Sequence, residues 1–177
     1  MPPADMVPAW IDGTLVPVDK LEVHRRGLRH MAVSVFVLHG ESVLLQRRAL
    51  AKYHTPGLWA NTCCTHPLWG EAPGACAVRR LRQELGIEGL DPVGKGRVEY
   101  RADVGGGLTE HEIVDIFVAR TDAPLTLRPD PAEVMETRWA PLGTLAAEIE
   151  ADPDRFTPWL RIYIARHAAA IFDTAAS

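Results

Sequence analysis

The stretch GACAVRRLRQELG, residues 74–86, sets the fold class, because it is a helical segment placed between two groups of strand-like segments. Four of its apolar residues recur at the spacing of a helix face, namely Ala77, Val78, Leu81 and Leu85. Gly86 supplies the stop signal, since glycine readily adopts the left-handed conformation that ends helices. The pattern predicts a helix of about three turns.

The segments on both sides of this helix predict strands. WIDGTLVPV (10–18) has two short β-type runs around Asp12-Gly13, and AVSVFVLHGESVLLQRR (32–48) repeats that design around Gly40. After the helix, GRVEYRAD (96–103) and LTEHEIVDIFVAR (108–120) predict two strands joined by a run of three glycines. Two more helices are expected at roughly 142–150 and 157–173. This order predicts an α/β fold of mixed α+β character, a sandwich in which helices cover a mainly antiparallel or mixed sheet.

Length and composition narrow the class of protein. The 177 residues suffice for one domain, expected over 1–177, with an ordinary hydrophobic core. A net charge of −4 argues against a nucleic-acid or membrane-surface partner. The sequence shows neither a leader pattern nor a membrane span, so a cytoplasmic location is expected. We also expect the protein to be a monomer or a weak homodimer. Three cysteines, an odd number, are expected to be reduced thiols.

The segment ANTCCTHP (60–67) contains two adjacent cysteines and a histidine. In an extended chain, side chains two residues apart share a face, so Cys64 and His66 point one way and Cys63 points the other. Only one cysteine can therefore act together with His66. The alternative for either thiol is packing as a small buried residue, which we expect for Cys63.

The segment TEHEIVDIF (109–117) applies the same rule to two carboxylates. Glu110 and Glu112 share the face that continues into apolar residues, which is unfavourable unless a metal ion or a proton occupies the site. The alternative is a solvated end of an edge strand. Together with His24, His30 and His66, these carboxylates offer nitrogen and oxygen donors suited to a divalent transition metal.

Basic and aromatic residues gather near the same segments. Lys20, Arg48 and Lys52 could bind an anionic group, although surface solvation would also explain them. Tyr100 and Trp159 could line a pocket whose π faces stabilise a cation, although most tryptophans belong to the core.

Taken together, five segments resemble the type I isopentenyl-diphosphate isomerases of the Nudix superfamily. They are RRALAKYHTPGLWANTCCTHP, RRLRQELGI, EYRAD, TEHEIVDIF and FTPWL, and the resemblance runs from about Lys20 to Trp159. It implies a Nudix α/β/α sandwich. It also implies the interconversion of isopentenyl and dimethylallyl diphosphate through a tertiary carbocation, a step in isoprenoid precursor synthesis.

The resemblance also implies roles for individual residues. Cys64 and Glu112 match the catalytic pair, with Tyr100 as a hydrogen-bonding partner and Trp159 in the carbocation pocket. The ligands of a Mn²⁺ or Zn²⁺ ion would be His24, His30, His66, Glu110 and Glu112. Glu84 would bind Mg²⁺ on the diphosphate side, and the diphosphate itself would contact Lys20, Arg48 and Lys52.

Some features depart from the Nudix pattern. When the hydrolase box is laid so that its last glutamate is Glu84, Glu71 and Arg79 match it, but Thr65, Arg80 and Gln83 replace a glycine and two metal-binding glutamates. A hydrolase of a nucleoside diphosphate derivative is therefore the alternative function, weakened by the charge of Arg80 beside Glu84. A zinc-stabilised binding module using Cys63, Cys64 and His66 is a further alternative, although adjacent cysteines lack the usual spacing of such sites. The loop from His24 to His30 is also one residue shorter than the resemblance leads us to expect.

Overall fold

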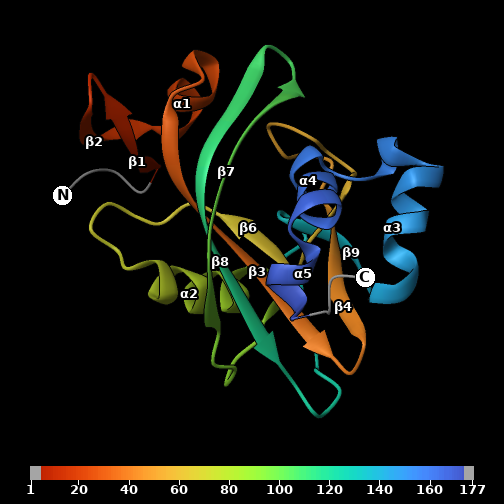
Figure 1. Cartoon of the computed structure of the whole chain (residues 1–177). Coiled ribbons are helices and arrows are strands. Elements are labelled where there is room, and N and C mark those ends of the chain that lie inside the picture. The colour runs from red at the N-terminus through yellow and green to blue at the C-terminus, as the bar shows by residue number, and fades with distance from the viewer. Residues whose placement is uncertain (1–4, 174–177) are drawn as a thin grey trace.

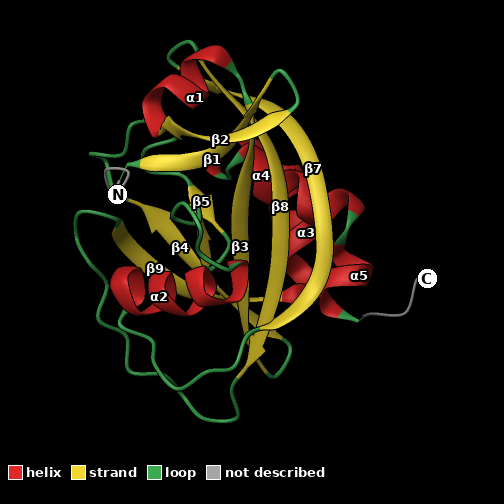
Figure 2. Ribbon diagram, turned by 90° about the vertical axis from the view of Figure 1, so that its left-hand side faces the viewer, coloured by secondary structure: helices red, strands yellow, loops and turns green. Residues whose placement is uncertain are grey.

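The structure is a computed structural model that describes residues 5–173. Its central feature is a mixed sheet with α2 on one face and α3, α4 and α5 on the other (Figures 1 and 2). The strands are β1 (Met6–Ile11), β2 (Thr14–Asp19), β3 (Arg29–His39), β4 (Ser42–Arg48), β5 (Trp59–Ala60), β6 (Cys63–Thr65), β7 (Val93–Gly105), β8 (Leu108–Arg120) and β9 (Val134–Pro141). The helices are α1 (Lys20–Arg26), α2 (Pro73–Leu85), α3 (Leu142–Ala151), the 3₁₀ turn Pro153–Arg155, α4 (Pro158–Arg166) and α5 (Ala168–Phe172). This arrangement confirms the predicted fold class.

Strand β3 organises the sheet because it pairs on both of its edges. It runs parallel to β8, with His30 opposite Glu112, and antiparallel to β6, with Ser34 opposite Cys64. The antiparallel partners β1 and β4 contact its two ends. The parallel pair makes the sheet mixed, and it brings side chains from three distant segments to one end of β3.

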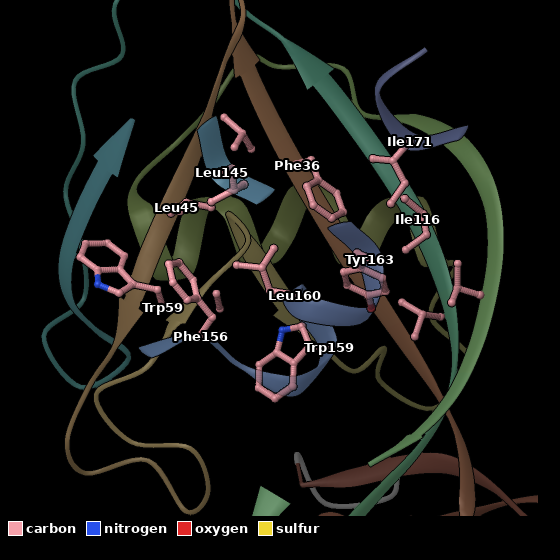
Figure 3. Packing of buried hydrophobic residues seen from close by; sticks show 14 of the residues in the cluster. Phe36, Leu45, Trp59, Ile116, Leu145, Phe156, Trp159, Leu160, Tyr163 and Ile171 are labelled. Carbon is pink, nitrogen blue, oxygen red and sulfur yellow. The ribbon is translucent and has the colours of Figure 1, made fainter. Parts of the chain in front are cut away.

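Two apolar layers hold the helices to the sheet. On one face, α3, α4 and α5 cover a cluster that includes Phe36, Trp159 and Tyr163 (Figure 3). The ring of Phe36 packs edge-on against Tyr163 at a centroid distance of 5.7 Å. On the other face, α2 buries Ala77, Leu81 and Leu85 against β3 and β6, and Val78 stays half exposed at 50%. The face predicted for this helix is therefore confirmed except at Val78.

The predicted turns follow from local backbone preferences. Both residues of the Asp12-Gly13 turn have positive φ angles, 49° and 79°, as a tight hairpin between twisted strands requires. Helix α2 ends where predicted, because Gly86 adopts the left-handed conformation at φ 67°. The glycine run after β7 is the predicted hairpin loop.

Several elements differ from the sequence-based expectations, including β1, which begins at Met6, and the short strand β5, which was not predicted. The segment before His30 is not a plain loop, because Asp19 caps a short helix, α1, which ends at Gly27. Strand β9 was missed; it pairs with β4, and its exposed residues interrupt the alternation of a typical strand. The last helix does not run to 173 without a break, because the backbone departs from helical geometry at His167 and α5 then turns Ile171 and Phe172 into the core.

Two further expectations concern the whole chain. In residues 5–173, the structure shows no helix long and apolar enough to cross a membrane. That residues 1–177 form one domain stays a prediction, because 1–4 and 174–177 lie outside the described residues.

Candidate active site

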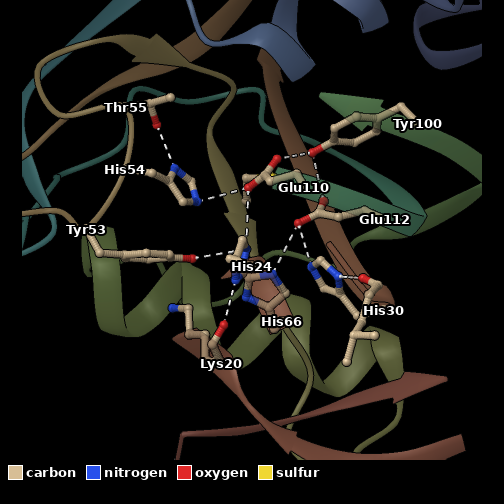
Figure 4. Close-up of polar contacts among 12 residues, drawn as sticks. Lys20, His24, His30, Tyr53, His54, Thr55, His66, Tyr100, Glu110 and Glu112 are labelled. Carbon is tan, nitrogen blue, oxygen red and sulfur yellow. Dashed lines mark hydrogen bonds and ion pairs between the residues drawn. The ribbon is translucent and has the colours of Figure 1, made fainter. Parts of the chain in front are cut away.

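The candidate site lies where α1, β6, β8 and the loop between β4 and β5 meet one end of β3 (Figure 4). His24 comes from the last turn of α1 and His30 from the start of β3. His66 follows β6, and Glu110 and Glu112 point inward from β8. The alternation predicted for β8 is confirmed, since both glutamates are buried, at 3% and 1% exposed, whereas the intervening His111 is not.

Glu112 lies at the centre of a cluster of three imidazoles. Its Oε1 atom is 3.3 Å from Nε2 of His30 and 3.1 Å from Nε2 of His66. The nearest ligand atoms of His24, His30, His66 and Glu112 all lie within 4.8 Å of one another. Burial of these groups removes them from water, so a positive charge among them would be strongly favourable.

The rings of His24 and His30 are oriented as metal ligands are. Nδ1 of His24 donates to the carbonyl of Lys20 at 2.6 Å, and Nδ1 of His30 donates to the carbonyl of Leu28 at 2.8 Å. A ring that donates through Nδ1 presents the lone pair of Nε2 to the carboxylates. Burial lowers the pKa of His24 to about 4, which keeps that ring neutral and able to bind a metal.

Glu110 contacts a histidine that the sequence analysis did not select. Its Oε1 atom is 3.0 Å from Nε2 of His54 and 3.9 Å from Nε2 of His24 (Figure 4). These three residues form a second set of ligand atoms within 4.8 Å of one another. The only sequence signal for His54 was its place in the loop that also carries Lys52.

Tyr100 lies behind the two carboxylates and does not line the cavity described below. Its hydroxyl is 2.5 Å from Oε2 of Glu110 and 2.8 Å from Oε2 of Glu112. The phenol has a single hydrogen, so it can donate to only one of these carboxylates at a time. Burial alone would raise the pKa of Glu112, but the close contact with the His30 imidazole and the hydrogen bond from Tyr100 outweigh burial, and the pKa is lowered.

The two cysteines of β6 point to opposite faces of the sheet, as predicted. Cys64 lies across β3 from the glutamates, with its sulfur 3.1 Å from the hydroxyl of Ser34, which in turn contacts the hydroxyl of Tyr163 at 2.9 Å. Burial raises the pKa of the Cys64 thiol, and the negative charge of Glu112 raises it further. Cys63 packs beside α2, but its thiol also donates to Oε2 of Glu84 at 3.1 Å, so its environment is not purely apolar.

Glu84 is held by three donors. Besides Cys63, Gln46 donates to its Oε2 at 3.0 Å, and Arg80 contacts its Oε1 at 2.6 Å. Arg80 occupies a position where a Nudix hydrolase has a metal-binding glutamate, and here it neutralises Glu84. The opposition between Arg80 and a metal-binding role of Glu84, expected from the sequence, corresponds to an Arg80–Glu84 ion pair in the structure.

A narrow cavity connects these groups. Its walls include the basic residues Lys20, Arg48, Lys52 and Arg80, the carboxylates Glu84, Glu110 and Glu112, and also Cys64, His54, His66 and Trp159. All the predicted site residues line this cavity except Tyr100, His24 and His30. Tyr100 contacts the glutamates from behind, and the buried His24 and His30 belong to the histidine–glutamate cluster. Burial and the charge of Lys52 lower the pKa of Lys20 to about 8. The guanidinium of Arg48 lies over the Trp159 ring, 5.3 Å from its centroid.

The donor set fits a divalent transition ion. Nε2 of His30 is buried and, within residues 5–173, makes no hydrogen bond. Neutral imidazoles and carboxylates are the donors that Mn²⁺ and Zn²⁺ accept. The cluster of His24, His30, His66 and Glu112, with Glu110 beside it, can thus hold such an ion.

Comparison with known proteins connects this geometry to a family. Residues 28–160 match the family described as NUDIX domain. The chain is 68% identical over 168 residues to the isopentenyl-diphosphate Delta-isomerase of Cereibacter sphaeroides strain ATCC 17029, covering 95% of both chains. It is 64% identical over 173 residues to the protein of that name from Dinoroseobacter shibae, covering 98% of both. Among solved structures, DR0079 from Deinococcus radiodurans superposes with a TM-score of 0.71 at 16% identity, over 91% of this chain and 98% of that one, which shows a shared fold.

Proposed function

This chain belongs to the isopentenyl-diphosphate Delta-isomerase family of NUDIX-domain proteins, and we propose that it interconverts isopentenyl diphosphate and dimethylallyl diphosphate. The observation that carries the proposal is the placement of Cys64 and Glu112 in the wall of one narrow cavity. They come from strands on opposite edges of β3, so a small substrate between them would have a proton-transfer group on either side.

The reaction needs two such groups because a proton is added at one carbon and removed from another. Protonation of the terminal CH₂ of isopentenyl diphosphate gives a tertiary carbocation, and loss of a proton from the carbon next to the diphosphate-bearing CH₂ forms the new double bond. Glu112 with Tyr100 would donate the first proton, and Cys64 would accept the second. This direction requires a protonated Glu112 and a Cys64 thiolate at the start, whereas the lowered pKa of Glu112 and the raised pKa of Cys64 favour the carboxylate and the thiol, so a proton must first pass from the Cys64 side to the Glu112 side. The hydroxyl of Ser34, 3.1 Å from the Cys64 sulfur, can donate to the thiolate.

The carbocation must be protected from water. Trp159 is 1% exposed and lines the cavity, and within the described residues its indole nitrogen has no hydrogen-bond partner. Its ring can stabilise the cation and exclude water from the reacting carbons, although the Arg48 guanidinium also lies over this ring, 5.3 Å from its centroid.

The basic residues would hold the diphosphate away from the reacting carbons. Lys20, Arg48 and Lys52 line the cavity with Glu84 and can neutralise the charge of the diphosphate. When bound, a Mn²⁺ or Zn²⁺ ion held by the histidine–glutamate cluster would neutralise charge beside Glu112. Glu84 would hold Mg²⁺, which would neutralise charge of the diphosphate, in place of part of its present contact with Arg80.

Incubation with isopentenyl diphosphate in D₂O, with Mg²⁺ and Mn²⁺ present, tests the proposal. We expect NMR to show dimethylallyl diphosphate carrying deuterium. Cys64→Ala and Glu112→Gln should each abolish this conversion while circular dichroism shows an intact fold. Cys76→Ala is the matched control, because Cys76 is buried in α2 outside the cavity and should leave activity unchanged. Full activity in Cys64→Ala would refute the assignment, and release of phosphate would indicate a hydrolase.

The two alternatives lack support in the described residues. The hydrolase would need carboxylates where Arg80 pairs with Glu84. The zinc module would need Cys63 and His66 on one ion, yet within residues 5–173 no metal-compatible cluster contains either cysteine. The quaternary state, monomer or weak homodimer, and the cytoplasmic location stay predictions.

A further inference from the structure

His54 has the position and environment of a metal ligand. It lies in the loop between β4 and β5, is 4% exposed, and faces Glu110 across 3.0 Å. A buried polar side chain normally finds a hydrogen-bond partner. Nε2 of His54 nevertheless makes no hydrogen bond within residues 5–173, although a carboxylate oxygen lies so close. Its position beside Glu110 therefore calls for an explanation other than an N–H···O bond.

The other ring nitrogen is anchored as it is in His24 and His30. Nδ1 of His54 lies 2.9 Å from the hydroxyl oxygen of Thr55, which can accept a hydrogen bond from it. Nη2 of Arg48, which can only donate, lies 3.5 Å from the same Nδ1 and donates at the shorter distance of 3.1 Å to the carbonyl of His54, so the Thr55 contact is the closer partner of Nδ1. In all three histidines, Nδ1 is bound to an oxygen of the chain and Nε2 faces a glutamate (Figure 4). In this tautomer, Nε2 carries a lone pair.

The spacing also fits two ligands of one ion. Metal bonds of about 2.1 Å at right angles place neighbouring ligand atoms about 3.0 Å apart. Nε2 of His54 and Oε1 of Glu110 are separated by 3.0 Å, as Nε2 of His30 and Oε1 of Glu112 are by 3.3 Å. His30 is the second histidine whose buried Nε2 lacks a hydrogen bond in the described residues.

We propose that His54 is a further ligand of the transition-metal centre, so that the ion binds four imidazoles instead of three. The inference deepens the proposed function, because it rests on the metal centre of that same site. A separate second ion would have to compete with the first for His24, because His24 belongs to both sets and its Nδ1 already donates to the Lys20 carbonyl, which leaves Nε2 as its one ligand atom. In the structure, His54 and Glu110 are grouped with His24 and not with His30, His66 and Glu112, so one ion that binds both sets would draw the two groups closer together around His24.

Cadmium NMR tests this without substrate. The full chain is labelled with ¹⁵N-histidine, stripped of metal and loaded with ¹¹³Cd²⁺, and couplings between cadmium and the ring nitrogens are recorded. We expect coupling to Nε2 of His54 in addition to that of His24, His30 and His66. The three remaining histidines, His39, His111 and His167, serve as internal controls and should show none. Absence of coupling at His54, with a proton on its Nε2, would overturn the proposal.

A pair of variants provides a second readout. His54→Phe fills the same space without a donor and should weaken Cd²⁺ binding by more than about tenfold in a competition titration. The matched control is His111→Phe, since His111 lies between the two glutamates but points away from the cluster. Equal affinity in His54→Phe and wild type would refute the proposal. If the isomerase assay fails while four couplings appear, the proposed function falls and the ligand assignment stands; three couplings in an active enzyme overturn the ligand assignment alone.

Discussion

Lys20 is expected to lose its positive charge as the pH rises through about 8. This lysine opens α1, lines the cavity, and has a pKa lowered to about 8 by burial and by the charge of Lys52. Its amine is charged below that pH and neutral above it. A rise in pH through about 8 therefore removes one positive charge from the proposed diphosphate site. Lys20→Arg is the matched variant, because a guanidinium stays charged throughout this range.

The size of the effect follows from the pKa. With a pKa of about 8, about 90% of Lys20 is charged at pH 7 and about 10% at pH 9. If only the charged form binds the diphosphate, kcat/KM falls with a limiting slope of about tenfold per pH unit above pH 8. The value of kcat should change less, because bound diphosphate favours the protonated amine and raises its pKa.

Steady-state isomerase assays between about pH 6.5 and 9.5 measure both parameters. We expect the alkaline fall of kcat/KM in wild type and a flat profile in Lys20→Arg over the same range. The variant also controls for other groups that titrate near pH 8, since their contribution would remain. A flat wild-type profile, or an equal fall in Lys20→Arg, would refute the reasoning.

Three further predictions address the supports of the site. Cys63→Ala removes a donor to Glu84, so the Mg²⁺ concentration for half-maximal activity should rise several-fold with little change in kcat; an unchanged Mg²⁺ requirement would argue against this role. Gly86→Ala places a Cβ 2.7 Å from Cβ of Arg128. The matched control is Gly89→Ala, because Gly89 has a similar positive φ but open space around it. Urea unfolding should show that Gly86→Ala lowers the free energy of unfolding by at least about 1 kcal/mol more than Gly89→Ala does. Removal of bound metal should lower the melting temperature, because an ion whose free concentration is 100 times its Kd stabilises the folded state by about 2.7 kcal/mol. An unchanged melting temperature would contradict a resident ion.

Local periodicity explains why much of the site could be anticipated. The alternation along β8 separates Glu110 and Glu112 from His111, and the alternation along β6 separates Cys64 from Cys63; both predictions needed only the geometry of an extended chain. The end of α2 at Gly86 is also local, because a single backbone conformation sets it. The break at His167 was missed because no glycine or proline marks it in the sequence around that residue.

The amino-acid pattern alone therefore established the order of elements, the faces of the strands and the residue types that can bind a metal and move protons. Only tertiary structure established which of them meet. The parallel register of β3 and β8 sets His30 opposite Glu112, and the loop after β4 places His54 against Glu110. Alternation is a property of neighbouring residues, whereas these contacts join distant segments, whose register is set by packing of the whole sheet.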